Sequence, residues 1–149
     1  MLPAILFLLA LQEVGQNGVV SIDSSYLHGE RLDFALTRTA LDAAPKWLEF
    51  RDDPPLAPRH AIHAAEGVLA KLVDNSGRWR LASVTLRPML GEDVWVYVVE
   101  FDAPFPDGPG AGGGPTATIR IPVLMNGYAV DPTRRPWPKT QLSDSNVYG

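Results

Sequence analysis

The sequence contains no cysteine, which limits the chemistry open to this chain. Disulfide bonds, thiolate metal sites, a cysteine nucleophile and a lipid anchor attached to cysteine are all excluded. A strong charge of one sign is also missing, because 13 Lys and Arg residues stand against 17 Asp and Glu residues and give a net charge of −4. Without a basic stripe, binding to nucleic acid has little electrostatic support.

Catalytic signatures are missing as well. The sequence has no Gly-x-Ser-x-Gly nucleophile elbow. The glycine-rich run 108–115 lacks the Lys and the Ser or Thr of a phosphate-binding loop, and a predicted strand rather than a helix follows it. Asp52 and Asp53 precede two prolines in an extended connector, where we expect them to be solvated. We therefore predict no catalytic, cofactor-binding or metal-binding residues, and we expect a protein that is not an enzyme.

The apolar run at the N-terminus is too short to span a membrane. It covers residues 4–11, whereas a membrane-spanning helix needs about 20 apolar residues. A short apolar run at this position is typical of a secretory signal, although no Lys or Arg precedes it. We expect residues 1–12 to be a signal sequence of an exported bacterial protein, periplasmic or secreted, with no stable membrane span. If the run is instead a buried strand or helix, the protein is cytoplasmic.

The chain contains enough apolar residues for one domain. Of its 149 residues, 46% are hydrophobic, which suits a single folded core. We predict a flexible lead-in over residues 13–30, a single α+β domain over 31–132 and a flexible, proline-containing tail over 133–149. Apolar spacing over 34–44 predicts a short extra N-terminal helix, but Leu32, Phe34 and Leu36 also alternate like a strand.

The stretch 58–130 predicts an amphipathic helix followed by a β-meander. Residues 58–73 begin with proline at the favoured first helical position, and their apolar residues recur on one face. Strands are predicted over 79–87, 94–101 and 116–125. Asn126 and Gly127 predict a two-residue type I′ turn that returns the chain as a short fourth strand over 128–130. The predicted fold class is therefore α+β, with the helix packed on a three- to four-stranded antiparallel meander.

The predicted strand 94–101 is apolar on both faces, so one face needs a cover besides the helix. Its aromatic residues, together with Trp79, could form a surface for a protein or peptide partner, because aromatic residues are enriched at the centres of interfaces. The alternative is a second layer of core beneath the N-terminal segment. The candidate partner-binding residues are Trp79, Trp95, Tyr97 and Phe101.

The segments 54–61, 79–86, 95–101 and 121–130 together resemble PepSY-like, cystatin-type domains of uncharacterised exported bacterial proteins. The resemblance covers about half of the chain and consists of packing and turn motifs. It implies an exported, non-catalytic module that binds a protein or peptide. Because PepSY domains are associated with inhibiting or chaperoning peptidases, it also implies a role in regulating a peptidase.

Three other interpretations stay open. His60, His63 and Glu66 follow one another at a spacing of three residues, so a metal-dependent or hydrolytic enzyme could use this helix face. The chain could also be a structural subunit of an envelope assembly. Finally, the segment 134–139 could be a polyproline-type ligand for a partner, or it could anchor Trp137 to its own domain.

Overall fold

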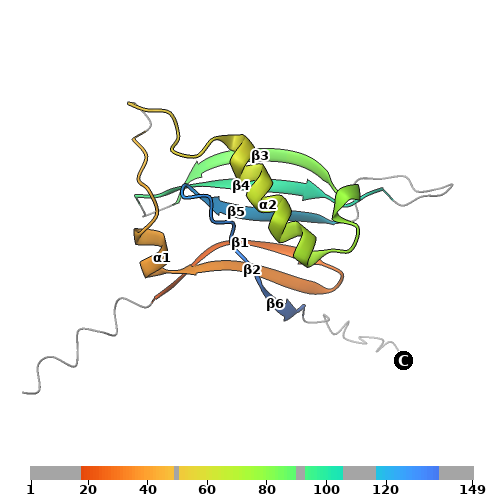
Figure 1. Ribbon diagram of the computed structural model, residues 1–149. Helices are drawn as coiled ribbons and strands as arrows, with labels where there is room; N and C mark the ends of the chain where they lie inside the picture. The colour runs from red at the N-terminus through yellow and green to blue at the C-terminus, as the bar shows by residue number, and fades with distance from the viewer. Residues whose placement is uncertain (1–17, 49–50, 90–92, 106–116, 138–149) are drawn as a thin grey trace, which may run out of the picture.

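The computed structural model describes residues 18–48, 51–89, 93–105 and 117–137. Two antiparallel three-stranded sheets and one main helix make up an α+β fold (Figure 1). One sheet has the strand order β1-β2-β6, and the other has the order β3-β4-β5. The strands are β1 (Val19–Leu27), β2 (Glu30–Thr37), β3 (Arg80–Pro88), β4 (Trp95–Asp102), β5 (Thr118–Leu124) and β6 (Thr133–Pro136). The helices are α1 (Arg38–Asp42), α2 (Pro58–Leu72) and the short 3-10 helix η1 (Ser76–Arg78).

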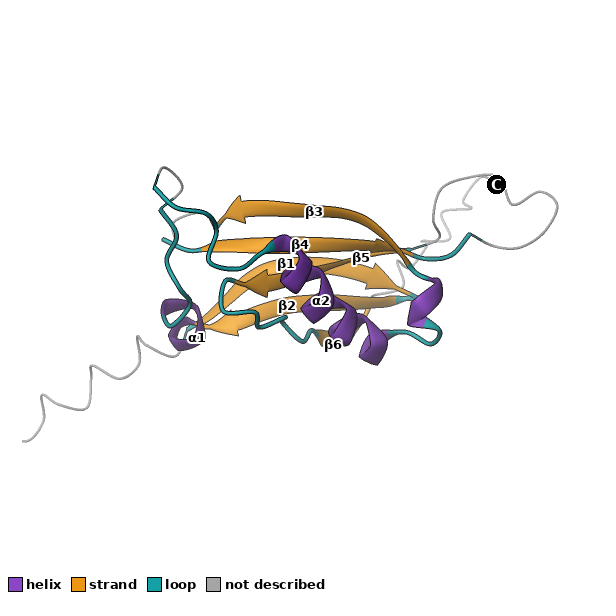
Figure 2. Cartoon of the chain, turned by 45° about the horizontal axis from the view of Figure 1, so that its top comes forward, coloured by secondary structure: helices purple, strands orange, loops and turns teal. Residues whose placement is uncertain are grey.

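Helix α2 confirms the predicted amphipathic helix. It begins at Pro58, whose fixed φ suits the first helical turn. Its buried residues, Ala61, Ala65, Val68 and Leu69, face β4 and β5, so the helix covers one side of that sheet (Figure 2). Two alanines at the contact allow the helix backbone to lie close to the strands. Among the described residues, no helix is long and apolar enough to cross a membrane.

Strands β3, β4 and β5 confirm the predicted meander. The central strand β4 pairs Val99 with Val84 on β3 and with Ile121 on β5. Pro122 lies inside β5, although proline is rare in paired strands. Its carbonyl accepts the Val130 N–H at 2.9 Å, so the backbone of Pro122 faces away from β4. The proline ring therefore removes no hydrogen bond from the β4 ladder.

The turn that follows β5 differs from the prediction of a type I′ turn at Asn126 and Gly127. The Gly127 N–H donates to the Leu124 carbonyl at 2.9 Å, and residues 125–127 form a three-residue loop. Gly127 has a φ of +86°, whereas Asn126 does not have a positive φ. This is a three-residue hairpin loop, in which only the last position needs the left-handed region. The returning chain makes a single bridge, Val123 with Ala129, instead of a fourth strand.

The predicted flexible lead-in is wrong for residues 19–27, which form β1. The strand pairs with β2, and His28 and Gly29 join them in a two-residue turn with φ values of +48° and +79°. Both positive φ values identify a type I′ turn. The helix predicted over 34–44 is also wrong for its first part, because Phe34 and Leu36 belong to β2 and α1 covers only Arg38–Asp42. The alternation of apolar residues in β2 was the correct signal.

The predicted flexible tail is wrong for residues 133–136, which form β6 at the edge of the first sheet. Arg134 pairs with Leu32 of β2, and the Trp137 N–H donates to the Gly29 carbonyl at 2.9 Å. The Trp137 ring meets the Tyr26 ring edge to face, with 4.6 Å between centroids. The segment therefore anchors Trp137 to its own domain. Residues 138–149 and the predicted signal sequence lie outside the described residues.

The two sheets meet where β1 packs against β5. The buried Ser25 hydroxyl of β1 accepts the Arg120 N–H of β5 at 2.9 Å, in place of a backbone partner. Two residues earlier in β1, the Asp23 carboxylate lies 3.0 Å from Arg120 Nη2 and 3.1 Å from Arg87 Nη2 of β3. Its side chain is only 6% exposed, so this carboxylate ties β1 to both outer strands of the second sheet.

Asp23→Asn is expected to destabilise the fold by about 2 kcal/mol, because a nearly buried carboxylate loses charged hydrogen bonds to two arginines. Urea unfolding followed by tryptophan fluorescence measures this. Asp131→Asn is the matched control, since Asp131 pairs with Lys71 at 3.3 Å on the exposed surface. It should change the free energy of unfolding by less than about 0.5 kcal/mol. Equal effects of the two substitutions would show that the Asp23 pair does not hold the sheets together.

Candidate functional site

The four aromatic residues predicted as a partner surface do not share one exposed face. Tyr97 and Phe101 are buried, at 2% and 3% exposure, and Trp79 and Trp95 are partly buried. The other face of β4 is covered too, because Val96 and Val98 are also buried. Most of these four aromatic residues therefore belong to the core, which was the alternative to a partner-binding surface.

Tyr97 and Trp95 hold the connector that leads into α2. The Tyr97 hydroxyl donates to the Leu56 carbonyl at 2.8 Å, and burial raises the pKa of this hydroxyl above its usual value. Trp95 meets Trp47 edge to face at 4.9 Å, and Trp47 Nε1 donates to the Asp52 carbonyl at 2.8 Å. These contacts are structural, because each one fixes the chain between α1 and α2.

Trp79 and Phe101 lie at the opposite end of β4, where they line a pocket of about 200 Å³ between α2 and β3. Leu69 of the helix and Leu81 of β3 complete its apolar wall, and Glu66 also lines it. Leu81 is 47% exposed, which is unusual for a leucine in a strand beside the core. Two of the four predicted residues are therefore brought together in an open pocket.

The pocket lies beside the free edge of β3, and the register shows which groups this edge presents. The Met89 N–H donates to the Val94 carbonyl at 2.9 Å, so Met89 and its partner form a hydrogen-bonded pair. Such pairs alternate with pairs whose backbone groups point away from the neighbouring strand. Counting back from Met89, residues 87, 85 and 83 face β4. The backbone groups of Val84, Leu86 and Pro88 therefore face outward.

Nothing described in the chain covers these outward groups. Among the residues that the structure describes, no backbone group forms a hydrogen bond with the outward N–H or carbonyl of Val84 or Leu86. The edge of β5 is closed by contrast, since Arg120 N–H bonds to Ser25 and Pro122 to Val130. Strand β6 is short, with four residues. The open edge of β3 is thus the part of the sheets best suited to pair with another chain.

The ends of this open edge are protected in two ways that natural edge strands use. A register shift between Leu81 and Ser83 marks a β-bulge at one end. Pro88 lies at the other end, in an outward position where its missing N–H would face solvent. The accessible run is therefore limited to residues 83–87. Sequence reasoning missed this site, although the proline that closes an unpartnered strand was a usable signal.

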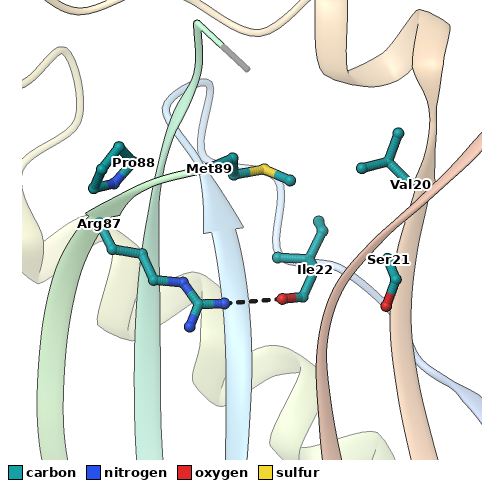
Figure 3. A pocket seen from close by; sticks show the side chains of 6 residues that line it. All are labelled: Val20, Ser21, Ile22, Arg87, Pro88 and Met89. Atoms are coloured by element: carbon teal, nitrogen blue, oxygen red, sulfur yellow. Dashed lines mark hydrogen bonds between the residues drawn. The ribbon is translucent and has the colours of Figure 1, made fainter. Parts of the chain in front are cut away.

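A second hollow lies beyond Pro88, in a crevice of about 370 Å³ between β1 and β3. Figure 3 shows Arg87 reaching across it to the Ile22 carbonyl, at 2.9 Å from Arg87 Nη2. The same nitrogen lies near Asp23, so the Arg87 guanidinium is already engaged in holding β1. Met89 lies near the arginine, and Val20 and Ile22 line the crevice from the β1 side (Figure 3). The Arg87 contacts belong to the junction of the two sheets.

The helix face proposed for a metal carries only a surface pair. His63 Nδ1 lies 3.6 Å from Glu66 Oε2, and the two side chains are 89% and 56% exposed. Within the described ranges, no three His, Asp or Glu side chains gather closely enough to hold a metal ion. His60, His63 and Glu66 therefore form part of the solvated face of α2.

Tyr97→Phe is expected to cost about 1 kcal/mol at neutral pH, because the hydrogen bond to Leu56 is lost. The raised pKa of Tyr97 adds a pH dependence. Its stabilising contribution is complete below about pH 10, where the unfolded hydroxyl ionises, and is lost as the pH rises further. Between pH 7 and pH 11, the free energy of unfolding measured in urea should therefore fall by less in Tyr97→Phe than in the wild type. The exposed Tyr128 provides the control, Tyr128→Phe; an equal effect there would contradict the assignment.

No protein-family model matches the chain, and comparisons with curated proteins and with solved structures find no match either.

Proposed function

We propose that this protein is a non-catalytic domain that binds an extended peptide segment of another protein by strand addition to β3. The observation that carries the proposal is the open edge over residues 83–87 beside the apolar pocket of Trp79, Leu81 and Phe101. Main-chain hydrogen bonds to an edge strand supply affinity in this mode of recognition, and a side-chain pocket supplies specificity.

The edge offers a small and definite set of hydrogen bonds. Val84 and Leu86 each present one outward N–H and one outward carbonyl, and Pro88 adds a carbonyl only. Each bond contributes about 1 kcal/mol net, and a buried apolar side chain contributes about 2 kcal/mol. The sum of about 7 kcal/mol corresponds to a dissociation constant between micromolar and millimolar. Such binding is reversible, as a regulatory or chaperoning contact requires.

The pocket selects the kind of side chain that the peptide presents. Its wall is apolar, so a large aliphatic or aromatic residue gains most from entering it. The carboxylate of Glu66 lies at the same pocket and disfavours an acidic residue there. The ligand class is therefore an extended peptide with one large apolar anchor and no acidic residue beside it.

The proposal keeps the PepSY-like interpretation of the chain. It is supported by the single amphipathic helix packed on the meander β3-β4-β5, in the expected chain order. Strands β1 and β2 precede the helix and are an addition to that arrangement. Export to the periplasm or medium completes the proposal, and its support is the apolar run over residues 4–11. A partner peptide from an exported peptidase would suit this setting.

Val84→Pro tests the edge, because proline removes one outward N–H without removing a bond to β4. Heptapeptides selected from a displayed library on the immobilised wild-type protein serve as the probe. Their affinity should fall about fivefold or more in Val84→Pro, the equivalent of one hydrogen bond. Val84→Ala shortens the same side chain but keeps the N–H, and it should retain binding within about twofold. Equal binding to both variants, or no selected peptide at all, would rule out strand addition at β3.

Leu81→Asp tests the pocket, since it places a carboxylate on the apolar wall beside Glu66. The same peptides should bind about tenfold more weakly, as the loss of an apolar contact of 1–2 kcal/mol requires. Leu48→Asp changes a similarly exposed leucine outside the pocket and should leave the affinity unaltered. Isothermal titration calorimetry measures both. A normal affinity in Leu81→Asp would place the anchor elsewhere.

A further inference from the structure

We infer that the open edge of β3 also pairs with the β3 edge of a second copy of this chain, antiparallel about a two-fold axis at Thr85. A two-fold contact uses the same surface on both subunits, so the edge must be complementary to itself. The alternation of inward and outward groups along β3 decides whether it is.

Outward residues of one copy must face outward residues of the other, and at least one such pair must join Val84 or Leu86 to Val84 or Leu86 of the second copy, which leaves three registers. They centre the axis on Val84, Thr85 or Leu86. Centring on Val84 places Leu86 opposite residue 82, which lies in the β-bulge. Centring on Leu86 places Val84 opposite Pro88, which has no N–H, so the Val84 carbonyl stays unpaired. Only the Thr85 register places Val84 and Leu86 opposite each other and satisfies all four N–H groups and all four carbonyls of these residues.

The side chains favour the same register. On one face Thr85 lies opposite Thr85 of the second copy, and such threonine pairs stabilise neighbouring strands. Ser83 then lies opposite Arg87 of the second copy, so no like charges meet. In the Leu86 register the two Arg87 side chains would become diagonal neighbours at about 7–8 Å and would repel each other. The other face of the edge presents the half-buried Val84 and Leu86 to their counterparts.

The pairing is limited in extent, which makes it reversible. The bulge near Leu81 and the proline at Pro88 confine it to about five residues on each copy. Contacts that bury less than about 1,200 Å² in total are weak and transient. The two-fold axis also closes the contact, because each β3 edge is used up by its partner and no further copy can add there. Strand addition therefore stops at the dimer.

The dimer would inhibit ligand binding by competition for the same edge. This part of the inference rests on the proposed function, because the two-fold pair uses the same N–H groups and carbonyls that a peptide would use. A peptide must displace the second copy, so its apparent affinity falls as the protein concentration rises above the dimer dissociation constant. The self-pairing itself depends only on the open edge.

The absence of cysteine allows a direct test with single-cysteine variants of the full chain. Thr85→Cys places two thiols in a non-hydrogen-bonded pair with Cα atoms about 4.5 Å apart, within the range of a disulfide. Ser83→Cys is the control, since the two copies of residue 83 would be four residues out of register, about 13 Å along the strand. Both positions are exposed, so the fold tolerates the changes.

Mild oxidation should convert Thr85→Cys to a disulfide dimer on a non-reducing gel and leave Ser83→Cys monomeric. No dimer from Thr85→Cys, or equal dimer from both variants, would overturn the two-fold pairing. Sedimentation velocity gives a second readout, in which Val84→Pro should remain monomeric at concentrations where Val84→Ala self-associates. Equal self-association of this pair would likewise overturn it.

A selected heptapeptide at saturating concentration should prevent the Thr85→Cys disulfide. Unchanged cross-linking in the presence of a bound peptide would contradict the competition between peptide and second copy, while the dimer itself would stand. Failure to select any peptide would overturn the proposed function instead, and the cross-linking result would be unaffected. The two failures are therefore distinguishable.

Discussion

The arrangement of the two sheets depends on the ion pairs that the Asp23 carboxylate makes with two arginines. This carboxylate faces Arg87 of β3 and Arg120 of β5 while belonging to β1, so a single side chain joins three strands. At the β-bulge after Ser21, the Ile22 carbonyl accepts a hydrogen bond from Arg87. With β1 fixed there, Ser25 closes the outer edge of β5. Among the residues that the structure describes, the second sheet then has one open edge left, and that edge belongs to β3.

The contrast between the two edges explains why binding is placed at β3. The Arg120 N–H and the Pro122 carbonyl on β5 have partners within the chain, whereas the outward groups of Val84 and Leu86 on β3 have none among the described residues. Proteins protect such edges because exposed backbone groups recruit other strands. Here the protection is partial, with a bulge and a proline at the ends and an open run between them. A short open run favours limited pairing over aggregation.

The central helix and the meander could be predicted from the sequence because local signals agreed there. Pro58, the apolar stripe of α2 and the β-branched run of β4 each point to the same structure. Strand β1 could not be predicted, since its Ser25 is stabilised by Arg120, which lies 95 residues away in the sequence. The site was found in part: Trp79 and Phe101 line the pocket, but the open edge depends on register, which periodicity alone does not reveal.

Strand β6 has a consequence for the order in which the chain assembles. Its residue Arg134 pairs with Leu32, so the last described strand completes a sheet begun near the N-terminus. The β1-β2 hairpin is synthesised before the other strands of the two sheets, yet Arg120 and β6 reach it only after about a hundred more residues. Contacts so distant in sequence slow folding, because the intervening chain must be ordered first. The hairpin made earliest therefore gains its contacts with β5 and β6 only when these distant segments have been made.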